Sequence, residues 1–179
     1  MVALILAPGF EEVEALTAAD FLRRAGVDVK LVGVGAGRIV GSHDIVVEAD
    51  VSLEDLEGEP EAVVVPGGMP GAENVAAAEK ALEMIRKVHA KGGLVAAICA
   101  APAVVLQPAG VLQGRRVTCY PGFEDRFRGC SFVEERVVVD GNVVTSRGPG
   151  TAAEFSIKLV EILAGPEAAE EIRRKTLQK

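Results

Sequence analysis

The sequence is short of the residues from which several common kinds of site are built. Its 179 residues include two histidines, no tryptophan, one tyrosine and three cysteines, which are Cys99, Cys119 and Cys130. Two histidines and no CxxC spacing are too little for a Cys/His zinc site, so we expect no metal. An odd number of cysteines without a disulfide pattern indicates a reduced, cytoplasmic protein.

Positive charge is also in deficit. There are 19 Lys and Arg against 26 Asp and Glu, which gives a formal net charge of -7. A nucleic acid would have to bind against the overall field of the protein, so we expect no such partner.

Long hydrophobic segments are missing as well. Residues 1–6 have no basic region, and their apolar run is too short for a signal peptide. Residues 92–114 carry no charge, but they are rich in Ala and Gly and are interrupted by Pro102, Gln107 and Pro108. We therefore expect a buried strand and helix there, and no membrane span.

What the chain has is a regular alternation of apolar strands and helices. With 49% apolar residues it can form one domain over residues 1–179. A strand, a helix and a second strand follow one another within residues 2–34, and such a unit implies a parallel sheet with right-handed crossovers. We predict a three-layer α/β sandwich that binds ligands beyond the carboxyl ends of its strands.

The expected elements follow from hydrophobic runs and from Gly, Pro and capping signals. Ser52 to Asp55 has the form of a helix start, and Thr151 with Glu154 has the form of a capping box. The predicted strands are 2–6, 28–34, 62–65, 94–98 and 117–120, with hairpins 38–40/45–49 and 137–139/143–146. The predicted helices are 11–25, 72–90, 100–106, one from Thr151 and one after Pro166.

Cys99 ends the short apolar run of residues 94–98, and a helix-like segment follows at once. A strand that stops at the thiol and feeds a helix is a nucleophile elbow. The N-terminus of the helix would favour a thiolate, so we expect the pKa of Cys99 to lie below the usual value of about 8.5. The alternative is a buried structural cysteine.

The loop after residue 6, the glycine-rich loop 66–71 and the Cys99 turn should meet at one edge of the sheet. The thiol, an early acidic residue and glycine N–H groups can converge there. Cys119, within a strand pattern, and Cys130, in an expected loop, are weaker candidates for redox chemistry.

The sequence resembles the DJ-1/ThiJ branch of the DJ-1/PfpI superfamily, which shares a flavodoxin-like α/β fold. The resemblance runs along almost the whole chain and rests on five segments, GFEEVE (9–14), RRAG (23–26), VPGG (65–68), AAICA (96–100) and SRGPGT (146–151). It implies a reactive Cys99, with Glu14 as its acidic partner and the N–H groups of Gly68 and Ala100 as oxyanion donors. It also implies a homodimer.

Helical spacing supports Glu14 separately, because Glu14 shares a face with Ala18, Phe21 and Ala25. A carboxyl buried beside a thiolate should have a raised pKa and could donate a proton to sulfur. The other explanation is that the three early acids merely complement the helix dipole, which suffices for Glu11 and Glu12.

One departure concerns histidine. Many family members place a histidine near the cysteine from residues 117–121, but this sequence has Tyr120 there. His43 lies in the early hairpin, His89 ends a helix, and no histidine follows Cys99. Hydrolysis by a Cys–His pair is therefore disfavoured, and we expect Tyr120 and Gly67 to line the pocket.

These residues suit addition of sulfur to an activated carbonyl, with N–H groups stabilising the oxyanion. The resemblance points to a glyoxalase III or protein deglycase that acts on methylglyoxal or on early glycation adducts of proteins, without a cofactor. The alternative is a protein of the oxidative-stress response, either a redox sensor or an oxidation-gated chaperone, that does not turn over a substrate.

Overall fold

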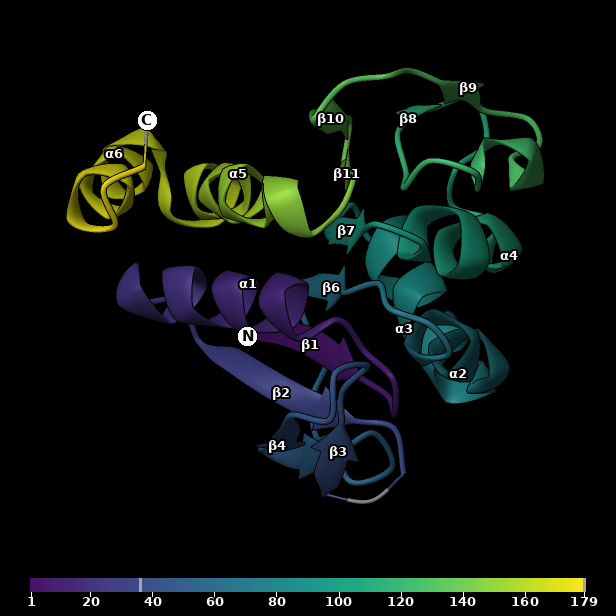
Figure 1. The fold of residues 1–179 in the computed structure, drawn as a ribbon, viewed down its shortest axis with the longest axis horizontal. Coiled ribbons are helices and arrows are strands. Elements are labelled where there is room, and N and C mark those ends of the chain that lie inside the picture. Colours follow the sequence, from purple (N-terminus) through teal and green to yellow (C-terminus); the bar gives the residue numbers. More distant parts are fainter. Residues whose placement is uncertain (36, 179) are drawn as a thin grey trace.

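A central seven-stranded sheet organises the computed structural model, which describes residues 1–35 and 37–178 (Figure 1). The strand order is β10-β11-β7-β6-β1-β2-β5, and every neighbouring pair is parallel except β10 with β11. The strands are β1 (Val2–Leu6), β2 (Val29–Gly33), β5 (Val51–Ser52), β6 (Ala62–Val65), β7 (Leu94–Ile98), β10 (Val137–Asp140) and β11 (Val143–Ser146). The predicted mixed α/β class with a mostly parallel sheet is confirmed.

Helices cover both faces of the sheet and complete three layers (Figure 1). Along β1, Leu4 and Leu6 belong to one core and Ala3 and Ile5 to the other, because successive side chains of a strand point to opposite faces. On one face lie α1 (Glu12–Arg24), α5 (Ala152–Ala164) and α6 (Pro166–Lys175). On the other lie α2 (Gly71–Ala77), α3 (Glu79–Ala90), η1 (Pro102–Leu106) and α4 (Gln107–Ala109).

None of the helices in the described residues is both long enough and apolar enough to cross a membrane. The uncharged stretch of residues 92–114 instead forms β7, η1 and α4. This agrees with the expectation of a buried strand and helix there.

The predicted helix over residues 72–90 is wrong in one respect, because it is two helices. Ala78 is extended, with ψ of 95°, and separates α2 from α3. Its carbonyl accepts hydrogen bonds from the N–H groups of Ala81 and Leu82, at 2.9 and 3.2 Å, and so begins α3. Alanine permits either conformation, and the break leaves apolar side chains of both helices buried in one core.

The predicted helix start at Ser52 is also wrong. Ser52 ends β5, its hydroxyl donates to Asp55 Oδ2 at 2.7 Å, and it accepts from the Asp55 N–H at 3.1 Å. These bonds close a local turn in competition with a helix. Gly58, at φ of 78°, and Pro60 follow, so an irregular loop over residues 53–61 connects β5 to β6.

The predicted strand over residues 117–120 is shorter than expected and lies outside the main sheet. β8 (Arg116–Val117) pairs with β9 (Ser131–Phe132), and η2 (Glu124–Arg126) lies between them. Beyond β8, the N–H of Thr118 donates to Thr145 Oγ1 at 2.9 Å and that of Tyr120 to the Cys99 carbonyl at 2.8 Å. The N–H groups of Thr118 and Tyr120 thus bind to Thr145 and to the Cys99 turn, so these residues do not continue the strand.

The early hairpin is confirmed as β3 (Arg38–Val40) and β4 (Val46–Glu48). Thr151 is the N-cap of α5, as predicted, but the predicted capping box with Glu154 is wrong. Thr151 ends η3 (Pro149–Thr151), its Oγ1 bonds the Gly148 N–H at 3.1 Å and Ser146 Oγ at 2.6 Å, and Glu154 pairs with Arg136.

Candidate functional site

Cys99 occupies a tight turn between β7 and the helical segment that begins at η1. Its φ is 65°, in the left-handed region, which costs a non-glycine residue about 1–3 kcal/mol. The turn is fixed on both sides, because the Cys99 N–H donates to the Ser146 carbonyl at 3.0 Å and its carbonyl accepts from Tyr120. The half-buried side chain lines a surface pocket.

The glycine-rich loop lies directly against this turn. A Cβ atom on Gly67 would come 2.5 Å from Cys99 Cβ and 2.9 Å from Glu14 Oε2, so no larger residue fits. Gly68 has φ of 85°, and its N–H and that of Ala100 both lower the pKa of the Cys99 thiol. The structure thus brings Cys99 together with Gly67, Gly68 and Ala100.

Glu14 lies on the buried face of α1 and is 1% exposed. Its Oε2 accepts a hydrogen bond from the Gly67 N–H at 2.7 Å, whereas Oε1 has no hydrogen-bond partner among the described residues. Burial raises the pKa of Glu14 to about 7, although the Gly67 N–H and the Cys99 thiol both lower it. Near neutral pH the carboxyl can therefore hold a proton beside the sulfur.

The thiol of Cys99 differs from the expectation of a low pKa. Burial, followed by the charge of Glu14, raises the pKa of Cys99 to about 12, and the N–H groups of Gly68 and Ala100 only partly offset this. A thiolate and a carboxylate side by side in a buried site repel each other, so the pair retains at least one proton. Protonation of Glu14 removes that repulsion, so the thiolate becomes accessible when the carboxyl holds the proton.

The pocket beside Cys99 is bordered by residues from several separate parts of the chain. Tyr120 is 46% exposed and packs against Gly148, where an added Cβ atom would lie 3.1 Å from the ring. Gly67 lies beneath the thiol. The lining residues are Glu11, Glu12, Val13, His43, Ile45, Gly68, Cys99, Tyr120 and Pro149.

Sequence reasoning missed the pairing of Glu12 with His43. Glu12 is 3% exposed, and its carboxylate accepts hydrogen bonds from the His43 N–H at 2.7 Å, from His43 Nδ1 at 2.9 Å and from the Ile45 N–H at 3.4 Å. Burial alone would raise the pKa of Glu12, but these bonds lower it to about 2. Glu12 thus holds the hairpin loop to α1, beyond any role with the helix dipole.

This pairing had one signal in the sequence. Gly41 precedes Ser42 and His43 in the turn, and a Cβ atom on Gly41 would collide with the Glu12 carboxylate. A glycine in a hairpin turn marks a place where another group approaches the backbone. The sequence does not reveal which group approaches.

Glu11, Glu12 and His43 also have potential metal-ligating atoms within 4.8 Å of one another. Both Glu12 oxygens already accept hydrogen bonds from the hairpin, and Ser42 Oγ lies 3.2 Å from Glu11 Oε2. We therefore interpret the group as a hydrogen-bonded ion-pair cluster.

The other two cysteines do not line the pocket. Cys119 is fully buried, and burial raises its pKa to about 12. Cys130 is half-buried, with its sulfur 3.7 Å from Gln107 Oε1, and burial raises its pKa too. In the described part of the chain, neither has a carboxyl hydrogen-bonded to its thiol as Glu14 is to that of Cys99.

Comparison with known proteins gives consistent matches. The sequence model of the DJ-1/PfpI family matches residues 1–162. Protein dj-1beta of Drosophila melanogaster is 42% identical over 178 residues, which cover 97% of this chain and 95% of that protein. The glutathione-independent glyoxalase DJR-1.2 of Caenorhabditis elegans is 36% identical over 170 residues, which cover 92% of this chain and 90% of that one. The structure of oxidized DJ-1 from Toxoplasma gondii has a TM-score of 0.95 at 40% identity, covering 98% of this chain and 97% of that one.

Proposed function

Because this chain belongs to the DJ-1/PfpI family, we propose that it is a cofactor-independent glyoxalase of the glyoxalase III or protein deglycase type. Its substrates are small 2-oxoaldehydes such as methylglyoxal, or early glycation adducts of proteins. A relative named as a glutathione-independent glyoxalase supports this class of activity. The single observation that carries the proposal is the buried Glu14 carboxyl, with one unbonded oxygen, beside the Cys99 thiol.

The reaction begins with addition of the Cys99 sulfur to the aldehyde carbon. A carbon–sulfur bond forms, and the carbonyl electron pair moves to oxygen, next to the N–H groups of Gly68 and Ala100. Protonation of that oxygen gives a hemithioacetal. Because the attack needs sulfur as the thiolate, Glu14 must hold the proton at this stage.

Glu14, once ionised, removes the proton from the carbon bonded to sulfur, which gives an enediol. Return of the proton to the neighbouring carbon converts the ketone to an alcohol and leaves a thioester. Water then releases the hydroxy acid and the thiol. One carbon is oxidised and its neighbour reduced, so the reaction needs no external oxidant, and a carboxyl with a pKa of about 7 suits both proton transfers.

The test is steady-state conversion of methylglyoxal to lactate by the purified protein. We expect turnover without glutathione, and none with Cys99→Ser, because the hydroxyl is a much weaker nucleophile at this pH. Parallel assays on methylglyoxal adducts of N-acetylcysteine and N-acetyllysine distinguish a deglycase from an enzyme that only consumes the free aldehyde.

A redox sensor or oxidation-gated chaperone is the second candidate. The observation that favours it is the same group of donors, because Glu14 Oε1 and the N–H groups of Gly68 and Ala100 could hold the oxygens of a sulfinate on Cys99. Lack of aldehyde turnover, together with selective oxidation of Cys99 by peroxide, would support this second function.

The partner is a second copy of the chain, since apolar side chains gather on α1 and the neighbouring hairpin. Five large apolar residues there are between 37% and 51% exposed: Val13, Leu16, Val40, Ile45 and Val46. Exposed apolar patches mark interaction surfaces. Val13 and Ile45 also line the Cys99 pocket, so the proposed dimer would border the site. The cytoplasmic location stays a prediction from the cysteine content.

A further inference from the structure

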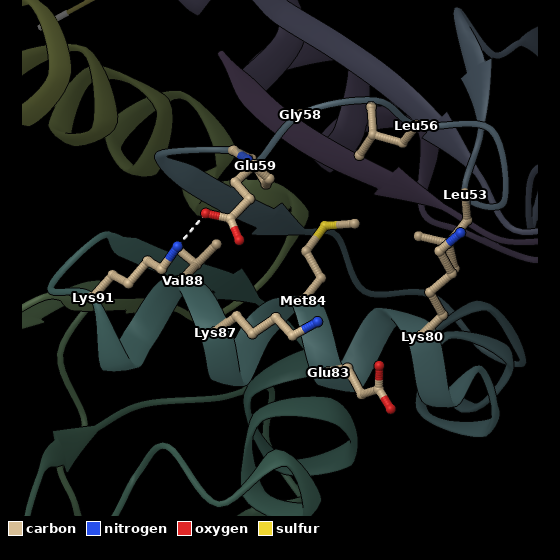
Figure 2. A pocket seen from close by; sticks show the side chains of 11 residues that line it. Leu53, Leu56, Gly58, Glu59, Lys80, Glu83, Met84, Lys87, Val88 and Lys91 are labelled. Carbon is tan, nitrogen blue, oxygen red and sulfur yellow. Dashed lines mark hydrogen bonds and ion pairs between the residues drawn. The ribbon is translucent and has the colours of Figure 1, made fainter.

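A second cavity lies between α3 and the loop 53–61. This loop takes the place of the helix that would usually connect two parallel strands such as β5 and β6. The resulting space, which we call the α3 slot, has a volume of about 170 Å³ (Figure 2). It shares no lining residue with the Cys99 pocket.

Two ion pairs connect α3 to the loop at opposite ends of the slot. Near the start of the helix, Lys80 Nζ donates to the Glu54 carbonyl at 2.8 Å and lies 3.2 Å from the Glu54 carboxylate. Near its end, Lys91 pairs with Glu59, as the dashed line in Figure 2 shows. These contacts hold the loop beside the helix and balance the charges of both lysines.

The floor of the slot is apolar and is formed by Leu53, Leu56, Met84 and Val88. Leu53 and Val88 are buried, whereas Leu56 and Met84 are only half-buried and present apolar surface to the space. The volume is below that of sites for drug-sized ligands, but an apolar cavity of about 150 Å³ holds benzene. The floor therefore suits one ring or a short branched chain.

Lys87 lies between the two ion pairs and forms no ion pair of its own, although its charge also acts on the Glu59 carboxylate that pairs with Lys91. No carboxylate in the described part of the chain comes within 4 Å of its ammonium group, which extends along α3 toward Met84 in Figure 2. Glu59 is already paired with Lys91, and Figure 2 shows the Glu83 carboxylate pointing away from the loop. One positive charge thus stands over an apolar floor.

We propose that the α3 slot binds a small amphipathic monoanion, an aromatic or branched aliphatic carboxylate, with its apolar part on Met84 and Leu56 and its carboxylate on Lys87. An ion pair on a partly apolar surface and burial of a ring favour binding together. A dianion would meet only one lysine that is free of an ion pair, and a neutral ligand would not gain the attraction to Lys87. The site does not depend on the chemistry of Cys99.

The test is NMR of protein labelled with ¹³C at the methionine methyl groups, because the chain has only Met1, Met69 and Met84. Met84→Leu assigns the Met84 signal. Benzoate is the probe, and benzamide is its neutral counterpart of the same shape. We expect saturable shifts of the Met84 signal with benzoate, without matching shifts of the other two.

Lys87→Gln should weaken benzoate binding about three- to tenfold, and benzamide should bind the unaltered protein more weakly by a similar factor. Lys158→Gln removes the same charge from α5, on the opposite face of the sheet, and should leave the affinity unchanged. The proposal is overturned if all three methionine signals shift without saturation. It is also overturned if Lys87→Gln binds benzoate as tightly as the unaltered protein.

Discussion

His43 Nδ1 lies 2.9 Å from Glu12 Oε2, which connects the loop between β3 and β4 to the first turn of α1. Both residues line the pocket beside Cys99. The buried Glu12 carboxylate thus holds the His43 loop in place as one wall of the pocket. The sequence of α1 or of the hairpin alone does not predict this contact.

The histidine should therefore titrate according to its acidic neighbours. The hydrogen bond that His43 donates to Glu12, with the charges of Glu11 and Glu12, raises the pKa of His43. We expect Glu12→Gln to lower this pKa toward the usual value of about 6.5. NMR titration of the two histidine rings measures the change, with His89 as the internal control. An unchanged His43 pKa would show that the pair does not form in solution.

Glu14 and Tyr120 should differ sharply in their effects on turnover. Glu14→Gln keeps the shape of the side chain but cannot transfer a proton as a carboxyl does, so we expect a loss in kcat of roughly 10²- to 10⁴-fold. Tyr120→Phe should cost much less, because the ring only borders the pocket. Methylglyoxal kinetics measure both effects, and circular dichroism checks the fold. A larger loss for Tyr120→Phe would assign a chemical step to the tyrosine.

The buried carboxyl should also make stability depend on pH. Because folding raises the pKa of Glu14 from 4.5 to about 7, its ionisation opposes folding, and stability falls as pH rises from about 4.5 to 7. Glu14→Gln removes this effect. The free energy of unfolding of the variant minus that of the unaltered protein should therefore increase by about 3 kcal/mol between pH 4.5 and 7.

Urea denaturation between pH 4 and 8 measures that difference. The same comparison in a Cys99→Ala background is the control for coupling to the thiol. A difference that stays constant with pH would mean that folding does not raise the pKa of Glu14.

Reactivity of the thiols should separate Cys99 from the other two cysteines. Cys99 lines an open pocket, whereas Cys119 is fully buried, so we expect iodoacetamide and peroxide to modify Cys99 first. Since burial and Glu14 raise the pKa of Cys99, its labelling rate should keep increasing above pH 7. Mass spectrometry of the labelled peptides measures the order. A Cys99 labelling rate that is already maximal at pH 6 would contradict the raised pKa and support the low pKa that the sequence predicts.

The apolar surface of α1 and the hairpin should control assembly. We expect a dimer mass by light scattering at micromolar protein, and dissociation with Val46→Glu. Val139→Glu is the matched control, because Val139 is similarly exposed, at 42% against 46%, but lies on β10. A monomer mass for the unaltered protein would contradict the proposed dimer.

The sequence was most informative where local signals and burial agree. Strands 62–65 and 94–98 have the predicted bounds, because each is a short apolar run, preceded by Glu61 or Gly93 and ended by Pro66 or the Cys99 turn, and is buried on both faces. Ala78 was missed because alanine favours a helix everywhere, and only packing creates the break.

At the site, the sequence indicated which residues gather around Cys99 but not their ionisation. The helix N-terminus suggested an acidic thiol, whereas burial of Cys99 and the facing Glu14 carboxyl act in the opposite direction. Burial depends on the whole fold, so a pattern around one residue does not supply it.

The two backbone hydrogen bonds of Cys99 have a consequence for the use of its thiol as a reporter. They reach Ser146 and Tyr120, which lie near the sulfur only when β11 and the segment after β8 have docked on β7. An unfolded chain carries an ordinary exposed thiol with a pKa of about 8.5. The pH at which Cys99 becomes reactive therefore measures whether the distant parts of the chain have assembled, without any added label.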